Sequence, residues 1–422
     1  MNLTGSQKYQ LLLEISHKIR DTLDLDVIME HLLDTIKTVL DYDAAGIFVL
    51  NQDLVHGRRQ QPRELIAGMC YRGYGPLPAG GDDMLNFGKG IIGQVILSGS
   101  CLVAPDVRQD PYYIEARQGT LSEIAVPILR NERAIGALNL ESDRLSAYDH
   151  SDLEVLQFFA DAAAIALEKA MLHRQLLEKE LLDRQLQMAR EMQFSLFPGE
   201  APRIPGYDMA GICIPAEEIG GDYYDFLRLP GGNLGLTVAD ISGHGISSAL
   251  VMTSFRGLLR THTHGRLGPA QIAVKINRLL PEFTGSSQFI TMVYAVLNPR
   301  DQIVTCVNCG HPPPLWRHAD GRWDALTTHG PALGIMEKSK FIPTGFSIQP
   351  GEILILYTDG VVEMDNPDGE YFGMERLKYA IDKYRDLSAY DLVRGIIQET
   401  RDFSGVQNYV DDFTILVVKR TD

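Results

Sequence analysis

The chain has 422 residues, of which 45% are hydrophobic and 22% are charged, and its formal net charge is −16. This length and composition predict a globular protein of two or three domains, each large enough to form its own core. The excess of acidic residues argues against a surface that binds nucleic acid, and no apolar run suits a signal peptide or a membrane span. We therefore expect a cytoplasmic protein with no nucleic-acid partner and no membrane insertion.

Apolar residues at helical spacing predict helices over residues 6–22 and 26–40. Strands are predicted further on, over residues 44–50, 64–71, 124–129 and 134–141. A short helix that begins at a glycine turn is predicted between them, over residues 88–96. This order predicts an α+β domain whose mostly antiparallel sheet is flanked by helices. The glycine turn at 88–93 could bind an anion, but a purely structural loop is the favoured interpretation.

Short motifs in this region resemble those of a GAF domain, and they cover residues 90–93, 102–107, 124–128 and 135–141. GAF domains are sensory modules that bind small molecules or pair with one another. The resemblance therefore implies a sensory domain over residues 1–165. It does not identify the ligand, because these motifs mainly build the fold.

Residues 151–196 contain neither proline nor glycine, which predicts one long helix that ends at Pro198. An apolar stripe with offsets of 11 residues runs along this helix, at Leu177, Leu181, Met188 and Met192. The helix could be a solvated spacer or half of a contact between two helices. We favour the contact, because an isolated helix needs an apolar partner to be stable. Residues 166–197 are accordingly assigned as a coiled-coil-like linker in a homodimer.

The remaining segment, residues 198–422, alternates short apolar runs with glycine and proline turns. The runs that predict strands cover 208–214, 222–228, 234–240, 291–297, 303–308, 353–358 and 414–419. Helices are predicted over 246–262, 269–279, 374–382 and 389–402. Many strands with a few long helices predict a β-sandwich covered by helices.

Aspartates stand at the ends of several of these strands. Asp240 and Asp359 each close an apolar run, whereas Asp222 and the pair Asp411 and Asp412 each precede one. Strands hold their ends rigidly, so these carboxylates are well placed to converge on one hard cation. No Cys or His cluster accompanies them, which favours Mg²⁺ or Mn²⁺ over Zn²⁺. Two such ions could clamp a phosphoryl oxygen and activate a water for in-line attack.

Cys306, Cys309 and His311 look like half of a zinc site. A tetrahedral site needs four ligands, and no second CxxC or HxxxH motif completes it. A buried strand that runs into a turn is the favoured interpretation. The five cysteines are scattered and odd in number, so they do not indicate a disulfide framework either.

Seven motifs, in order, resemble the SpoIIE/RsbU-type branch of the PPM metal-dependent serine/threonine phosphatases, at residues 188–198, 219–226, 239–245, 289–294, 308–315, 357–360 and 411–414. The resemblance implies an αββα sandwich over residues 198–422 and two Mn²⁺ or Mg²⁺ ions. It also implies hydrolysis of phosphoserine or phosphothreonine on a partner protein. In this bacterial branch the partners are typically anti-sigma-factor antagonists of the STAS type.

Roles in the metal site follow from the same resemblance. Asp240 would bridge the two ions while the backbone carbonyl of Ile241 ligates one of them. Asp222 would hold the metals directly or through water, and with Asp240 it would form the catalytic pair. Asp359 and Asp411 would complete the shell of the second ion. Asp412 is a further candidate ligand, ranked below Asp411 because strand alternation points it the other way.

The leading hypothesis is thus a phosphatase regulated by its GAF domain, with the signal passing through the 151–197 helix to the helix over 246–262. A catalytically inactive scaffold that acts through protein–protein contact is the alternative, although all four expected aspartates are present. A metal-dependent nuclease is disfavoured by the acidic charge and the lack of basic clusters.

Overall fold

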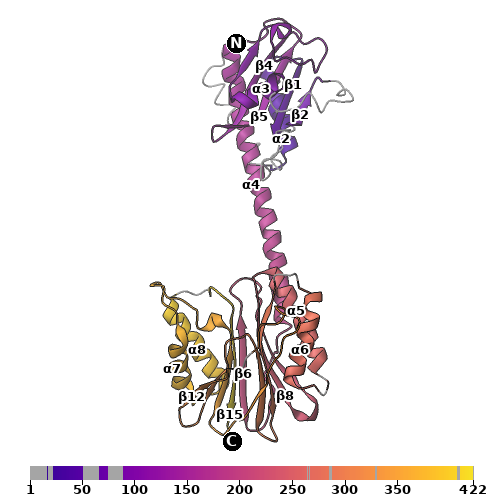
Figure 1. Ribbon diagram of the computed structural model, residues 1–422. Coiled ribbons are helices and arrows are strands. Elements are labelled where there is room, and N and C mark those ends of the chain that lie inside the picture. The colour runs from indigo at the N-terminus through magenta and orange to yellow at the C-terminus, as the bar shows by residue number, and fades with distance from the viewer. Residues whose placement is uncertain are drawn as a thin grey trace. The chain divides into compact units, whose positions relative to one another are not determined.

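A computed structural model describes residues 17, 22–50, 66–74, 89–263, 265, 267–284, 288–327, 330–405 and 409–421. The chain divides into two compact units, Met1–Leu181 and Leu182–Asp422. Their boundary falls inside the long helix α4 (His150–Phe194), which Figure 1 shows. The predicted helix over residues 6–22 falls almost entirely outside the described residues. Within the described ranges, no helix combines the length and the apolar character that a bilayer span requires.

The N-terminal unit is built on a five-stranded antiparallel sheet with the order β2-β1-β5-β4-β3. Its strands are β1 (Ala44–Leu50), β2 (Ile66–Arg72), β3 (Leu102–Ala104), β4 (Ser122–Arg130) and β5 (Arg133–Ser142). The predicted antiparallel sheet is confirmed. Strand β3 was not predicted, because three residues are too few to show a period-2 pattern.

Helices pack on both faces of this sheet. Helix α2 (Leu25–Val39) begins after Asp24, whose carboxylate accepts hydrogen bonds from the first turn of the helix. Its buried residues share one core with Ile47 of β1 and with the start of α4, whereas Phe48 joins a second core with helix α3 (Gly90–Ser98). Successive residues of a strand point to opposite faces of the sheet, so the adjacent residues Ile47 and Phe48 pack in different cores.

Helix α4 begins where the sequence predicts. The Asp149 carboxylate accepts hydrogen bonds from the backbone N–H of Ser151 (2.7 Å) and Asp152 (3.3 Å), which caps the helix. The first turns of α4 are buried in the N-terminal core. Beyond them, the predicted stripe is more than half exposed at each of its four positions, Leu177, Leu181, Met188 and Met192.

The C-terminal unit contains two five-stranded antiparallel sheets, with the orders β13-β10-β9-β8-β7 and β12-β11-β14-β15-β6. The first comprises β7 (Tyr223–Arg228), β8 (Leu234–Ile241), β9 (Ile290–Asn298), β10 (Ile303–Cys309) and β13 (Thr344–Ser347). The second comprises β6 (Tyr207–Ile214), β11 (Leu315–Arg317), β12 (Trp323–Ala325), β14 (Ile353–Tyr357) and β15 (Phe413–Arg420).

Three apolar cores hold these sheets in four layers. One core lies between the sheets, where Val238 and Leu236 of the first sheet pack with Leu416 of the second. The outer face of the first sheet packs on α5 (Ile246–Thr263) and α6 (Pro269–Leu279). The outer face of the second packs on α7 (Gly373–Tyr384) and α8 (Ala389–Ser404). Figure 1 shows the two helix pairs on opposite sides of the sandwich, so the predicted αββα architecture is confirmed.

Candidate metal and active site

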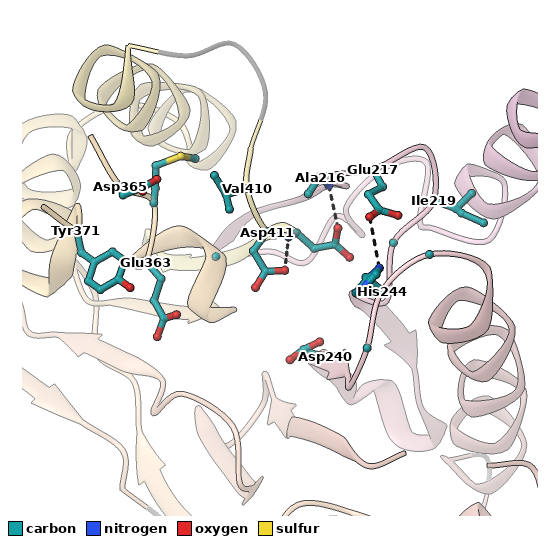
Figure 2. A pocket seen from close by; sticks show the side chains of 16 residues that line it. Ala216, Glu217, Ile219, Asp240, His244, Glu363, Asp365, Tyr371, Val410 and Asp411 are labelled. Carbon is teal, nitrogen blue, oxygen red and sulfur yellow. Dashed lines mark hydrogen bonds and ion pairs between the residues drawn. The ribbon is translucent and has the colours of Figure 1, made fainter. Parts of the chain in front are cut away.

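Four strand ends of the C-terminal unit meet at one edge of the sandwich. Asp240 lies near the end of β8, Asp359 follows β14, Asp411 precedes β15 and Asp222 precedes β7. A cleft of about 530 Å³ opens here, and Asp240, Asp411 and Asp412 line it. Figure 2 shows the side chains of Asp240 and Asp411 facing the same space. Asp222 lies beneath this surface, with only 2% of its area exposed.

Negative charge is crowded around Asp240. Burial, together with the nearby carboxylates of Asp359, Asp411 and Asp412, raises the pKa of Asp240 to about 7. The pKa of Asp411 is also raised, by partial burial of its carboxylate and by the charges of Asp359 and Asp412, although the residue is exposed at the surface. Carboxylates in such a group repel one another unless protons or cations reduce their charge. The donor set consists of hard oxygen ligands, which fits Mg²⁺ or Mn²⁺.

These carboxylates do not close around a single point. Among the residues that the structure describes, no three Asp, Glu, His or Cys side chains are grouped so that they could hold one metal ion. An ion held here would bind fewer than three of these side chains directly and would complete its coordination with water or backbone carbonyls. Mg²⁺ commonly binds in this way, through one or two carboxylates and several waters.

Thr358 fixes the buried carboxylate of Asp222. Its Oγ1 donates a hydrogen bond to Oδ2 of Asp222 (2.8 Å) and accepts one from the backbone N–H of Thr414 (3.0 Å). Burial, with Asp240 and Asp412 nearby, raises the pKa of Asp222 well above its usual range. Thr358 therefore ties the ends of β14 and β15 to Asp222. Sequence reasoning did not single it out, although it lies next to Asp359.

Gly221 brings the loop before β7 close to the backbone of Ile241. A Cβ atom at position 221 would lie 2.8 Å from the carbonyl oxygen of Ile241 and 3.1 Å from Cβ of Ser248. Any side chain at this position would force the two segments apart, so the close approach requires glycine. The predicted backbone ligand, the Ile241 carbonyl, thus lies directly against the loop that carries Asp222.

Asp412 has a different environment from Asp411. Its carboxylate accepts hydrogen bonds from the backbone N–H groups of Ala216 (2.9 Å), Gly221 (2.7 Å) and Asp222 (3.2 Å). Both oxygens of Asp412 are used in this way, whereas the exposed Asp411 accepts a hydrogen bond from the backbone N–H of Asp412. In this structure Asp412 holds the loop of Asp222 in place.

His311 connects the two sheets behind the cleft. Its Nε2 lies 3.0 Å from the carbonyl oxygen of Tyr357 and its Nδ1 lies 2.7 Å from Oγ1 of Thr291. Since a carbonyl only accepts, Nε2 carries the proton and the Thr291 hydroxyl donates to Nδ1. Burial lowers the pKa of His311 to about 3, so the ring is neutral. Thr291 pairs directly with Asp240 across β8 and β9, so His311 links the strand beside Asp240 to the strand before Asp359.

The half zinc motif is part of the core. Cys306 packs between the two sheets and Cys309 packs under α5 and α6, on the opposite face of β10. Residues three apart in a strand point in opposite directions, so the two thiols cannot share one ion. This bears out the favoured interpretation of a buried strand that runs into a turn.

The end of α4 reaches the same loop. Nε2 of Gln193 donates a hydrogen bond to the carbonyl oxygen of Gly220 (2.7 Å), and the N–H of Gly220 donates one to Oε1 of Gln193 (3.1 Å). Arg256 of α5 donates to the carbonyl oxygen of Leu196 (2.9 Å). Sequence reasoning missed Gln193, because nothing in a helical pattern distinguishes one glutamine from its neighbours.

Comparison with known families agrees with this architecture. Residues 230–421 match the family described as Stage II sporulation protein E (SpoIIE), and residues 22–168 match the GAF domain family. The chain joins a GAF domain to a SpoIIE domain. Asp240, Asp359, Asp411 and Asp412 all lie within the SpoIIE match.

Relatives of this GAF–SpoIIE protein include two from Bacillus subtilis that are named phosphoserine phosphatases. RsbU is 27% identical over 237 residues, which cover 56% of this chain and 70% of RsbU. RsbP is 28% identical over 188 residues, which cover 43% of this chain and 45% of RsbP. The SiaA-PP2C domain of Pseudomonas aeruginosa shares the fold, with a TM-score of 0.51 and 18% identity, and covers 58% of this chain and 99% of that domain. The SpoIIE domain is therefore similar in sequence to two named phosphoserine phosphatases and shares the fold of a PP2C domain.

Proposed function

We propose that the SpoIIE domain hydrolyses phosphoserine or phosphothreonine on a protein partner, with two Mn²⁺ or Mg²⁺ ions, and that the GAF domain regulates it. One observation carries this proposal. Asp222, Asp240, Asp359 and Asp411, which lie up to 189 positions apart in the sequence, gather at one edge of the sandwich around an acidic cleft. The repulsion among them favours divalent cations.

In this proposal Asp240, Asp411 and Asp359 hold the ions at the surface, and Asp222 and the Ile241 carbonyl support them from beneath. When bound, the ions supply Lewis acidity that polarises a phosphoryl oxygen and lowers the pKa of a water. The chain's own contribution is to fix the geometry. Thr358 orients Asp222, Asp412 fixes the loop backbone, and His311 keeps β9 and β14 together.

The substrate class follows from the relatives and from the shape of the site. RsbU and RsbP are named phosphoserine phosphatases, and an open cleft suits a side chain presented on a protein surface. We infer that the partner is a phosphorylated signalling protein, in particular an anti-sigma-factor antagonist of the STAS type. The GAF domain would bind a small-molecule signal.

An assay for metal-dependent hydrolysis tests this function. The full chain is treated with EDTA, dialysed, and supplied with Mn²⁺, Mg²⁺ or Zn²⁺ before addition of p-nitrophenyl phosphate and of a phosphoserine peptide. The proposal expects hydrolysis with Mn²⁺ or Mg²⁺ and none with EDTA. If the well-folded protein hydrolyses neither substrate with any of these ions, the alternative of an inactive scaffold would replace it.

Regulation would reach the site through the last turn of α4. Gln193 is almost fully buried, and its side-chain amide forms a reciprocal pair of hydrogen bonds with the backbone of Gly220. Gly220 and Gly221 in turn carry Asp222 and contact Asp412. A rotation or shift of α4 would therefore move the loop of Asp222 through a direct contact.

Replacement of Gln193 tests this path. We expect Gln193→Ala to lower the apparent affinity for Mn²⁺ about fivefold, because losing two hydrogen bonds, at about 0.5–1 kcal/mol each, loosens the loop. The measurement is the Mn²⁺ dependence of p-nitrophenyl phosphate hydrolysis. Gln187→Ala is the matched control, since Gln187 lies on the same helix and its side chain donates a hydrogen bond to the exposed Glu191. Equal Mn²⁺ dependence in both variants would contradict the path.

The predicted homodimer belongs to the same proposal. The exposed stripe of Leu177, Leu181, Met188 and Met192 gives α4 an apolar face that a second copy of α4 would cover. Sedimentation equilibrium of the full chain should give twice the mass of one chain. A monomer at micromolar concentration would contradict this part of the proposal.

A further inference from the structure

The cleft beside the proposed metal site has an unusual electrostatic character for a site that receives a phosphate. Sixteen of the residues that the structure describes line it, and none of these sixteen is Lys or Arg. Besides the site aspartates, its walls carry Glu217, Glu363 and Asp365. A phosphate-binding pocket normally draws its ligand in with Arg or Lys. In the described part of the cleft, bound cations would therefore attract the phosphoryl group, while the acidic walls repel other negative charge.

These three wall acids have no part in holding the site together. Glu217 lies 3.4 Å from Nδ1 of the exposed His244. In the part of the chain that the structure describes, the carboxylates of Glu363 and Asp365 have neither a hydrogen-bond partner nor an ion-pair partner. Both side chains are exposed. Two divalent ions carry four positive charges, which would balance Asp222, Asp240, Asp359 and Asp411 and leave the wall acids unneutralised.

The segment after Asp359 forms a hairpin that carries Asp365 and Tyr371. Asp365 and Tyr371 face each other across a β-bridge, and backbone hydrogen bonds join Asn366 to Glu370 (3.0 Å) and Phe372 to Met364 (2.7 Å). Tyr371 is 61% exposed although it lines the cleft. Figure 2 shows Glu363, Asp365 and Tyr371 on one side of the cleft and Glu217 and His244 on the other.

A carboxylate beside an exposed aromatic ring suits a guanidinium or ammonium group. Arg pairs with carboxylates through its planar fork and packs on the face of an aromatic ring, and both contacts strengthen when the cation is partly removed from water. Because the hairpin is fixed by backbone hydrogen bonds, these groups are positioned before a ligand arrives. Acidic walls would also discriminate against substrates that carry acidic residues at the same place.

We propose that the cleft selects phosphorylated segments that carry an arginine or lysine close to the phosphorylated serine or threonine, and that Glu363, Asp365 and Tyr371 bind this cation. This inference rests on the proposed phosphatase function and specifies its substrate class. Glu363, Asp365 and Tyr371 are specificity residues in it. They hold the flanking residue of the substrate and do not touch the phosphoryl group.

The test compares phosphoserine peptides that differ only in the residues flanking the phosphoserine, which are Arg in one peptide and Glu in the other. The measured quantity is the ratio of kcat/KM for the two, with Mn²⁺ and the full chain. We expect the Arg peptide to be preferred about tenfold at 50 mM salt and about twofold at 500 mM, since salt screens exposed charge pairs. The double variant Glu363→Lys, Asp365→Lys should reverse the preference.

Asp368→Lys is the matched control. Asp368 lies on the same hairpin, is exposed, and does not line the cleft. The kcat/KM ratio of Asp368→Lys for the two peptides should therefore equal that of the wild type. Equal kcat/KM of the wild type for the two peptides would overturn this inference. So would an equal change of the kcat/KM ratio in the double variant and in Asp368→Lys. Either result would leave the phosphatase function standing. Failure of the wild type to hydrolyse either peptide or p-nitrophenyl phosphate would overturn the function itself, and this inference with it.

Discussion

Replacing Asp240 with Asn should lower the Mn²⁺-dependent kcat/KM for p-nitrophenyl phosphate by about 1000-fold or more, which corresponds to about 4 kcal/mol of transition-state stabilisation. Asp240 lies at the point where β8 ends in the cleft, and its carboxylate is surrounded by those of Asp359, Asp411 and Asp412. An amide retains the shape of this side chain but cannot supply the charge that attracts a divalent ion.

The same variant should be more stable than the wild type when no metal is present. The pKa of Asp240 is raised to about 7, so the folded state binds a proton more tightly than the unfolded state does. The stability of the wild type therefore falls as the pH rises from about 4 to about 7, and above that range the charge of Asp240 destabilises the fold. Asn removes this repulsion, so Asp240→Asn should gain up to about 4 kcal/mol in the free energy of unfolding at pH 8.

Unfolding by urea, followed by tryptophan fluorescence, measures this change in stability in the C-terminal unit. Both tryptophans of the chain, Trp316 and Trp323, belong to the C-terminal unit. Asp301→Asn, in the exposed turn after β9, serves as the control and should change neither activity nor stability. A variant that is inactive and also unstable would not support a metal role, because misfolding would explain the loss. Full activity in Asp240→Asn would contradict the role directly.

Replacing Asp412 with Ala should mainly lower the stability of the fold, whereas replacing Asp411 should mainly weaken the apparent affinity for Mn²⁺. Asp412→Ala removes the acceptor for the backbone N–H groups of Ala216, Gly221 and Asp222. Hydrogen bonds to a charged group contribute about 1.5–3 kcal/mol each and do not add fully, so we expect a loss of about 3 kcal/mol in the free energy of unfolding. Activity should fall as well, because the loop of Asp222 loses its support.

Asp411→Ala provides the comparison. Asp411 is exposed and its carboxylate accepts one local backbone hydrogen bond, so its loss should change stability by about 0.5 kcal/mol or less. Its effect should appear in the Mn²⁺ dependence of activity, with a weaker apparent affinity. Unfolding curves and Mn²⁺ titrations of the two variants separate these roles. If Asp411→Ala were the less stable variant, the division of roles between the adjacent aspartates would be wrong.

Much of the fold could be predicted from local patterns. Strands such as β8 and β15 are continuous apolar runs, and helices such as α6 and α8 show helical spacing between clear boundaries. The short strands β11, β12 and β13 have three or four residues each. They were missed because their conformation depends on pairing with neighbouring strands and not on a pattern of their own.

The candidate site could be predicted only in part, for a related reason. An aspartate at the end of an apolar run is visible in the sequence, so Asp240 and Asp359 stood out. The contacts that orient them are between segments far apart in the chain. Gln193 with Gly220, and Thr358 with Asp222, become neighbours only after the two sheets and α4 have packed. Glutamine and threonine are also common residues without a distinctive spacing, so no sequence signal marked them.

Anomalous diffraction from crystals of the full chain grown with Mn²⁺ shows whether the acidic cleft binds metal. We expect anomalous peaks in the cleft between Asp240, Asp359 and Asp411, within coordination distance of the Asp240 carboxylate, and the loss of these peaks in Asp240→Asn. A metal role for these aspartates would be contradicted if the cleft of a well-diffracting, Mn²⁺-saturated crystal held no anomalous peak, or if Mn²⁺ were bound at residues outside this cleft.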